Sequence, residues 1–256
     1  MAEKLYDLSV PVGYMTPDWM GHPPAMMEDT FLFRVHRHEV PVFPGMSRRI
    51  SEYIGIWHKG THFDGPTHHV EGGMTSDKMP LDCFYGTGVI VDFRYMKKWD
   101  VVTAKDLENA NPKIEEGDIV LMNTGWHHYW RVNDFVYYNH YPGMYTEAGE
   151  WLLDKKVKML GGTWGATDHP LAHYPLRAMY PNLYEEYKQE TGKDADVEFP
   201  DYEPCHQICS SNMIPAIENV GGDIDAVTGK RCMIAAFPFR FADAGHMIRV
   251  VAIVDE

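Results

Sequence analysis

Residues 58–69 read HKGTHFDGPTHH and place four histidines and one aspartate within twelve positions. Such a density of imidazole and carboxylate groups is hard to explain by packing alone. His58 and His62 have the i, i+4 spacing of a helical zinc pair, but the two glycines and the proline of this stretch oppose a helix. We therefore expect a strand that runs into a turn, with a backbone shaped around a bound group.

A metal ion is the bound group that these side chains favour. In an extended segment side chains two positions apart share a face, so His62 and Asp64 can point at one ion. The freedom of the glycines lets the backbone bring His58 towards the same ion. Two neutral imidazoles and a carboxylate suit Zn, Mn, Fe or Co, and three protein ligands leave a position for water. A His-rich surface loop and a purely structural metal are the alternatives.

Outward from this stretch, short β-branched runs alternate with helical segments. Strands are expected over 87–93, 118–123, 157–160, 233–237 and 247–254. Helices are expected over 103–110 and 146–153, and each of these two segments begins with a threonine. The last two strands, joined through 240–245, are expected to be antiparallel. Residues 175–204 are expected to form an excursion from the main domain that carries a short helix over 183–190. The pattern predicts a single α/β domain over residues 1–256 with a mixed β-sheet.

Composition limits the partners and the compartment. Asp and Glu outnumber Lys and Arg by 37 to 23, for a formal charge of -14, which opposes binding to nucleic acid and to acidic membranes. The amino terminus lacks a signal pattern, and no apolar run approaches the roughly 18 residues of a spanning helix, so we expect a soluble cytoplasmic protein. The four cysteines are expected to be reduced and structural. Cys205 and Cys209 flank His206, so a thiolate ligand is a weaker alternative.

The stretch resembles the signature H-x-G-T-H-x-D-x-P-x-H of the cyclase-like metal hydrolases, a family that includes bacterial kynurenine formamidase and isatin hydrolase. All seven fixed positions are matched between His58 and His68. Further pieces follow in family order: DLS at 7–9, WMG at 19–21 for W-P-G, GDIVLMNTGW at 117–126, PCH at 204–206 and IEN at 217–219. The resemblance implies the swivelling β/β/α cyclase-like fold and a homodimer or homotetramer.

The resemblance also implies roles for individual residues. It implies metal ligands from two distant parts of the chain: His58, His62, Asp64, His206 and Glu218. Asp64 could bridge to a second ion, so one or two ions, Zn or Mn, are expected in each subunit. His68 matches the proton-transferring histidine of the family. Glu218 could be a ligand or the base that orients water.

Substrate contacts are expected from Trp19, which matches a pocket residue of the formamidases, and from Phe63, Thr124 and Trp126. The aromatic residues of 126–145 could form a pocket wall or an oligomer interface.

Other histidines are assigned from the residues themselves. His69 is expected to point away from the metal, and His127 and His128 to be structural or solvated. His169 and His173 could reach the site.

The sequence departs from the family pattern at three places, all in segments that are expected to shape the substrate pocket. Gly161-Gly162-Thr163-Trp164 replaces the family's G-I-D, with Asp168 a few residues later. Met20 replaces the proline of W-P-G, and the 175–204 excursion is longer than in the compact formamidases. These changes leave the predicted metal ligands intact but weaken any inference of specificity for kynurenine derivatives.

The sequence therefore predicts a metal-dependent hydrolase that cleaves a C–N bond in a small molecule, such as an amide, arylformamide, cyclic imide or lactam. Metal-activated water would attack the carbonyl, and His68 would pass a proton to the leaving nitrogen. One alternative keeps this site and changes the bond to an ester or lactone. Another is a metal-binding protein without catalytic activity.

Overall fold

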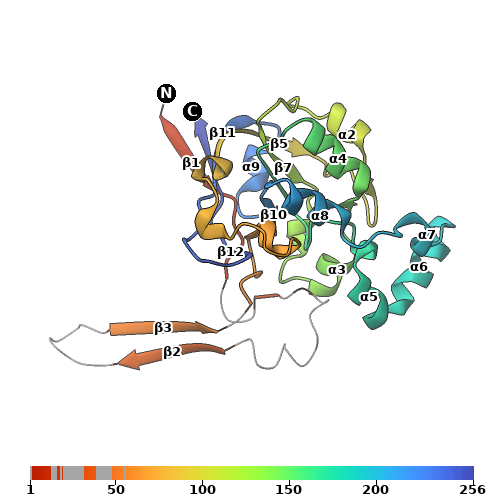
Figure 1. The fold of residues 1–256 in the computed structure, drawn as a ribbon, viewed down its shortest axis with the longest axis horizontal. Coiled ribbons are helices and arrows are strands. Elements are labelled where there is room, and N and C mark those ends of the chain that lie inside the picture. Colours follow the sequence, from red (N-terminus) through yellow and green to blue (C-terminus); the bar gives the residue numbers. More distant parts are fainter. Residues whose placement is uncertain (1, 13–15, 18, 20–31, 39–47, 55) are drawn as a thin grey trace.

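Three of the predicted apolar runs form neighbouring parallel strands at the centre of one mixed sheet (Figure 1). They are β5 (Tyr85–Asp92), β7 (Ile119–Asn123) and β9 (Met159–Gly162). The computed structural model describes the whole chain apart from residues 1, 13–15, 18, 20–31, 39–47 and 55. The predicted α/β class with a mixed sheet is confirmed.

Antiparallel strands extend the sheet on both sides of this centre. On one side β10 (Ala216–Glu218) continues the parallel set, followed by the antiparallel β4 (His62–Asp64) and β12 (Gly245–Met247). On the other side lie β11 (Arg231–Ala235), β13 (Val251–Asp255) and β1 (Glu3–Asp7). The order of the nine strands is β1-β13-β11-β5-β7-β9-β10-β4-β12.

The strand expected over 247–254 is divided between opposite ends of the sheet. Its second half, β13, pairs antiparallel with β11, as expected for the last pair of strands. Its beginning belongs to β12, which pairs with β4 instead. Between the two halves, the backbone N–H groups of Ile248 and Val250 bond to Thr61 and Ser9 rather than to a neighbouring strand. A continuous apolar run therefore serves two separate strands.

The central strands are apolar on both faces, because each face packs against its own core. Alternate residues separate cleanly: Val89 and Val91 of β5 belong to one cluster, and Ile90 belongs to the other. The first core is covered by α2 (Ala104–Glu108), α4 (Thr146–Asp154) and α8 (Pro204–Ser211). The second is covered by α9 (Ile224–Val227) and the short turn η3 (Leu81–Phe84).

Both predicted helices are present. Thr103 caps α2, where its side chain and that of Asp106 form a reciprocal capping box. The helix expected over 146–153 is α4, but Thr146 is its first residue and Tyr145 holds the cap position. The threonine therefore does not cap this helix.

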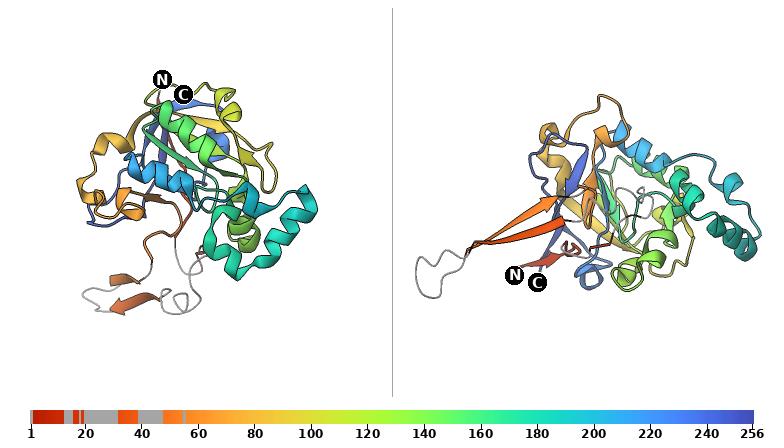
Figure 2. Two further views of the ribbon diagram at one scale, coloured as in Figure 1. Left: turned by 45° about the vertical axis from the view of Figure 1, so that its right-hand side comes forward. Right: turned by 90° about the horizontal axis from the view of Figure 1, so that it is seen from below.

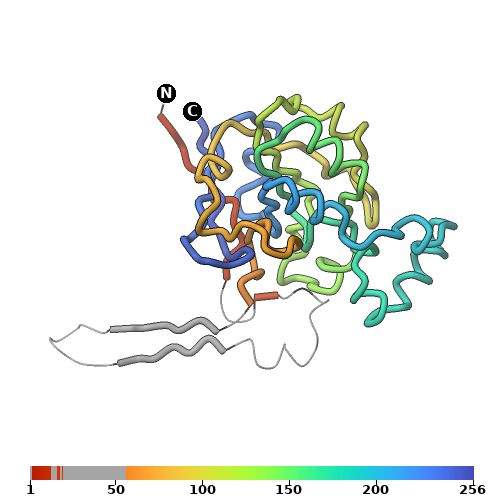
Figure 3. The backbone as a smooth tube through the Cα atoms, viewed as in Figure 1, coloured from red at the N-terminus to blue at the C-terminus, as the bar shows by residue number. Residues whose placement is uncertain are grey.

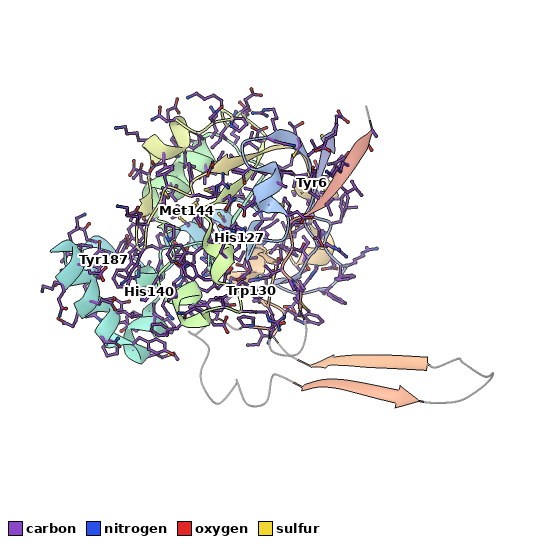
Figure 4. The ribbon with its side chains drawn as sticks, turned by 180° about the vertical axis from the view of Figure 1, so that it is seen from behind. Tyr6, His127, Trp130, His140, Met144 and Tyr187 are labelled. Atoms are coloured by element: carbon purple, nitrogen blue, oxygen red, sulfur yellow. The ribbon has the colours of Figure 1, made fainter. Side chains whose placement is uncertain are left out.

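The 175–204 excursion forms α5 (Tyr174–Met179), α6 (Pro181–Thr191) and α7 (Ala195–Glu198). The short helix expected over 183–190 lies within α6, which ends where Gly192 adopts a left-handed conformation. A third apolar cluster joins these helices to the main body. In it Tyr187 of α6, labelled in Figure 4, contacts Trp99. The centroids of the two rings lie 5.7 Å apart.

The remaining elements are short. α3 (Asp134–Asn139) and the turns η1 (Pro66–His68), η2 (Ser76–Lys78), η4 (Trp126–Tyr129) and η5 (Pro170–Ala172) lie between strands. The backbones of β2 (Leu32–His38) and β3 (Arg48–Ile54) pair as an antiparallel hairpin (Figure 2), and β6 (Val101–Val102) pairs with β8 (Gly143–Met144). The two ends of the chain lie side by side, because β1 pairs with β13 (Figure 3). Within the described residues, no helix combines the length and apolar character needed to cross a bilayer.

Candidate active site

The His-rich stretch forms strand β4 and the turn η1, as expected from its glycines and proline. Gly60 precedes the strand in a left-handed conformation with φ 60°, which glycine adopts without steric cost. Pro66 occupies the first turn of η1. β4 lies between β10 and β12, so the ligand-rich segment is held on both edges.

Pairing of β4 with β10 brings the two parts of the predicted site together. His62 lies directly opposite Glu218 in the antiparallel register. His62 Nδ1 donates to the Gly60 carbonyl at 2.8 Å, which leaves Nε2 for the carboxylates. That nitrogen lies 3.4 Å from Glu218 Oε2 and 3.7 Å from Asp64 Oδ1. All three side chains are buried.

His206 approaches the same carboxylates from the amino-terminal turn of α8. Its Nε2 lies 3.0 Å from Glu218 Oε1 and 3.3 Å from Asp64 Oδ2. Asp168 holds the other side of the ring, with Oδ2 2.6 Å from Nδ1, and also accepts the backbone N–H groups of Cys205 and His206. One carboxylate thus fixes both the start of the helix and the orientation of its histidine.

His58 and His68 complete the cluster on the open side. His58 Nδ1 lies 2.5 Å from Asp64 Oδ1. The ring of His68 stacks on that of His58, with centroids 4.3 Å apart and planes 27° apart, and His68 is exposed. Two overlapping groups therefore share Asp64 and could each hold an ion: His62, Asp64 and Glu218, and His58, Asp64 and His68.

The electrostatics of the cluster follow from buried opposite charges. Burial would raise the pKa of Asp64, but His68 and His58 outweigh it and hold that pKa well below its usual value. Burial would lower the pKa of His206, yet its bonds to Asp168, Asp64 and Glu218 raise it well above 6.5. Desolvation lowers the pKa of His68 to about 4, against the attraction of Asp64. Carboxylates this buried require cationic partners.

The donor set fits a divalent transition metal. Ligands on a tetrahedral ion at about 2.1 Å lie roughly 3.4 Å from one another, and the separations across this cluster run from 3.0 Å to 3.7 Å around that spacing. Imidazole and carboxylate together suit Zn or Mn. His62, Asp64, His206 and Glu218 could hold such an ion, with His58 beside them.

A cavity of about 460 Å³ opens over the cluster. Its other wall consists of aromatic and polar side chains from distant segments: Trp19, His69, Tyr138, His173, Tyr202 and Glu203. Trp19 is half-buried, and its ring meets the edge of His173 at 5.3 Å. The cavity therefore places one polar, metal-suited wall opposite a largely aromatic one.

Glu203 joins two histidines of this wall. It precedes α8 in a left-handed conformation with φ 45°, which is uncommon for a residue with a side chain. Its carboxylate lies 2.7 Å from His69 Nε2 and 2.8 Å from His173 Nδ1. Burial would raise the pKa of Glu203, but the bonds to His173 and His69 hold it far below its usual value. His69 thus bonds to Glu203 rather than to the cluster, although it lines the same cavity.

Three residues expected to contact substrate lie elsewhere. Phe63 points to the opposite face of β4 from His62 and Asp64 and packs in the second core, because side chains alternate along a strand. Thr124 is buried with its hydroxyl 2.9 Å from that of Thr163. Trp126 is buried in the first core and donates to the Val136 carbonyl at 3.1 Å.

Two other expectations concern the segment after β7. His127 and His128 both face Asp225, at 3.4 Å and 2.8 Å, and neither lines the cavity. His127 belongs to η4, and Figure 4 labels it. Most of the aromatic rings of 126–145 are core residues, and only Tyr138 reaches the cavity wall.

Asp168, Glu203 and Asn219 contribute to the site without having been predicted. Asp168 comes shortly after β9, where the family pattern G-I-D has its aspartate. An acidic residue at this place in the sequence could therefore have indicated a site residue. Glu203 and Asn219 adjoin His206 and Glu218 in sequence. Nothing in the local sequence indicates the left-handed backbone of Glu203, whereas asparagine at position 219 is one of the residues that adopt this conformation more readily.

The fold and the cluster define a class: an α/β protein with a buried histidine and carboxylate site at the edge of a mixed sheet. Residues 6–169 match the model of the family described as "Putative cyclase". The match spans more than half of the 256 residues. The chain belongs to this cyclase family.

Curated relatives match part of the chain. A kynurenine formamidase of Erythrobacter litoralis is 33% identical over 108 residues, which is 41% of this chain and 44% of the relative. A kynurenine formamidase of Bacillus cereus is 23% identical over 155 residues, 60% of this chain and 66% of the relative. An uncharacterized protein of Haemophilus influenzae is 28% identical over 108 residues, 42% of this chain and 76% of the relative.

Solved structures match nearly the whole chain. An isatin hydrolase bound to the product analogue thioisatinate has a TM-score of 0.73 at 20% identity, covering 99% of this chain and 93% of that one. A structure of a potential metal-dependent hydrolase with cyclase activity has a TM-score of 0.66 at 22% identity and covers 100% of both chains. At this identity the likeness establishes a shared fold.

Proposed function

We propose that the protein is a metal-dependent hydrolase that cleaves a C–N bond in a small amide, arylformamide, cyclic imide or lactam. The observation that carries this proposal is the convergence of Asp64, Glu218, His62 and His206 on the floor of one cavity. The names of the kynurenine formamidase relatives and of the isatin hydrolase neighbour support the choice of bond.

A divalent ion held by these side chains would supply a nucleophile at neutral pH and polarise a substrate carbonyl. Asp64 and Glu218 would provide the negative charge that retains such an ion. Asp168 keeps His206 in place through Nδ1, and the Gly60 carbonyl does the same for His62. The histidines therefore present Nε2 to the site without rearrangement.

In this proposal His68 moves the proton. It stacks on His58 at the open side of the cluster and lines the cavity. Its ring forms no hydrogen bond with any residue that the structure describes, so a ring nitrogen is free for the attacking water or the leaving nitrogen. Breaking a C–N bond needs such a proton, because an amine anion is a poor leaving group.

The opposite wall fits a small planar substrate. Trp19, Tyr138 and Tyr202 line it, and aromatic side chains favour flat apolar groups. A cavity of about 460 Å³ lies in the size range of small-molecule sites. An ester or lactone would meet the same groups, and its alkoxide leaving group would depend less on His68.

Removal and return of metal tests the proposal. Protein stripped with a chelator, then reloaded with Zn or Mn, is assayed on an arylformamide, isatin, a cyclic imide and a lactone. We expect turnover of at least one C–N substrate that disappears with the metal and returns with it. Turnover of the lactone alone would favour the ester alternative, and no metal-dependent turnover of any substrate would contradict the proposal.

A further inference from the structure

Asn219 lies beside the cluster and takes no part in the mechanism proposed above. It directly follows Glu218 at the end of β10 and lines the cavity, although only 2% of it is exposed. Its backbone is left-handed, with φ 56°, a conformation that asparagine tolerates better than most residues. The backbone thus turns the side chain towards the cluster.

The rest of Asn219 is fixed by neighbours. Its backbone N–H donates to the Trp164 carbonyl at 3.0 Å, and its carbonyl accepts from the Thr61 hydroxyl at 2.6 Å. Its side-chain oxygen accepts from the hydroxyl of the fully buried Tyr137 at 2.9 Å. The amide plane is therefore held, with the Nδ2 end turned away from Tyr137.

The Nδ2 group has no acceptor within the described part of the chain. Its near neighbour is His62 Nδ1, at 3.4 Å. That nitrogen lies 2.8 Å from the Gly60 carbonyl, which can only accept, so Nδ1 must carry a hydrogen. Two donors face each other, and the Asn219 amide keeps its hydrogens for another group.

A buried donor without an acceptor is costly in a folded protein. At a cavity wall beside a catalytic cluster, the missing acceptor is most simply an atom of the bound substrate. The substrates proposed above all carry a carbonyl oxygen. That oxygen gains negative charge when the carbonyl carbon is attacked, and a fixed N–H donor stabilises the developing charge.

We propose that the Asn219 side chain donates a hydrogen bond to the carbonyl oxygen of the amide that is cleaved, and that Tyr137 is the positioning residue that aims it. This inference rests on the proposed hydrolase function. It adds a substrate-contacting residue from the chain itself. It also requires a substrate with an unblocked carbonyl oxygen at the reacting carbon.

Two replacements separate the hydrogen bond from charge effects. Asn219→Gly keeps the left-handed backbone and removes the amide without adding charge. Asn219→Asp keeps the size and the acceptor for Tyr137 but removes the donor. Asn212→Asp makes the same chemical change at an exposed position at the end of α8 and is the matched control.

With the best substrate of the panel, we expect both Asn219 variants to lose roughly 10²–10³-fold in kcat, with KM raised by no more than about 10-fold. Tyr137→Phe should show a smaller loss of the same kind, and Asn212→Asp none. Metal content should match the wild type throughout. A loss confined to Asn219→Asp would point to added charge, and an increase in KM with kcat unchanged would mean that Asn219 adds no stabilisation when the carbonyl is attacked. Either result would overturn the inference while the hydrolase function stands.

Binding to metal-free protein gives a second, activity-independent test. Acetanilide carries a carbonyl oxygen, and calorimetry should find it bound about 2- to 10-fold more weakly by the Asn219 variants than by the wild type. Equal affinities would contradict the contact. If the metal-loaded wild type turns over no substrate of the panel, the proposed function fails first, and the role of Asn219 falls with it.

Discussion

Among single residues, the role of His68 best distinguishes a catalytic metal site from a site that only binds metal. It belongs to a group with His58 and Asp64 that could hold an ion, yet it lies on the exposed side of the cluster. A ligand and a proton carrier respond differently to replacement. The role of His68 therefore decides how much of the site is catalytic machinery.

We expect His68→Ala to lower kcat on an amide by roughly 10²–10⁴-fold, the usual contribution of general acid–base catalysis. Its metal content should stay at the wild-type level. Metal analysis and steady-state kinetics on the same preparation check both statements. His62→Ala is the comparison, because it should lose metal and activity together. If His68→Ala loses metal to the same extent, His68 is a ligand.

His169 gives a prediction for pH. Burial lowers its pKa to about 3, and its neutral ring both donates to the Trp99 carbonyl and accepts from the Leu171 N–H. The unfolded chain has a histidine pKa near 6.5. Between these values the unfolded state binds more protons than the fold, so this histidine makes the protein less stable as pH falls below about 6.5.

Urea unfolding of wild type and His169→Gln between pH 4 and 6 measures this contribution. The free energy of unfolding of the wild type should fall more steeply, by up to about 1.4 kcal/mol per pH unit. Parallel curves for the two proteins would mean that His169 does not remain neutral in the fold.

Strand β4 is the element on which the site depends. Alternation along it placed His62 and Asp64 on one face, as the sequence predicted, and the same alternation sends Phe63 to the core. Local pattern alone could not find its partners. β10 and α8 reach the cluster only through the sheet order and the bond from Asp168 to the start of α8, and His206 and Glu218 were predicted solely by resemblance.

Close packing against β12 holds β4 in position. A Cβ atom at Gly245 would lie 2.1 Å from the Phe63 carbonyl oxygen and 3.1 Å from His58 Cε1. Gly245 pairs with Asp64 in the sheet. Any larger residue at this position must therefore displace β12 or push β4 and its ligands towards β10.

We expect Gly245→Ala to lower the free energy of unfolding by about 1–3 kcal/mol and to weaken metal binding. Gly117→Ala is the control, because φ is +81° there and nothing lies within 4 Å of the added carbon. It should cost about 1 kcal/mol through backbone strain and leave metal affinity unchanged. Urea unfolding and metal titration provide the two measurements, and equal metal affinities in all three proteins would contradict the account of β4.

For the molecule as a whole, the sequence predicted the α/β class, the mixed sheet and its central strands, because apolar runs bounded by turn residues carry that information locally. It could not divide 247–254 between β12 and β13, since that depends on which distant strand each half meets. The 175–204 excursion packs through Trp99, far away in sequence. The homodimer or homotetramer stays a prediction.

The central claim is that a divalent ion binds where the two parts of the chain converge. Anomalous scattering from crystals grown with Zn or Mn, recorded at each metal edge, tests it most directly. The account predicts a peak coordinated by His62, Asp64, His206 and Glu218, with His58 beside them. Crystals grown with either metal that show no anomalous peak at this site would contradict the claim. Metal bound only at His127, His128 and Asp225 would contradict it as well.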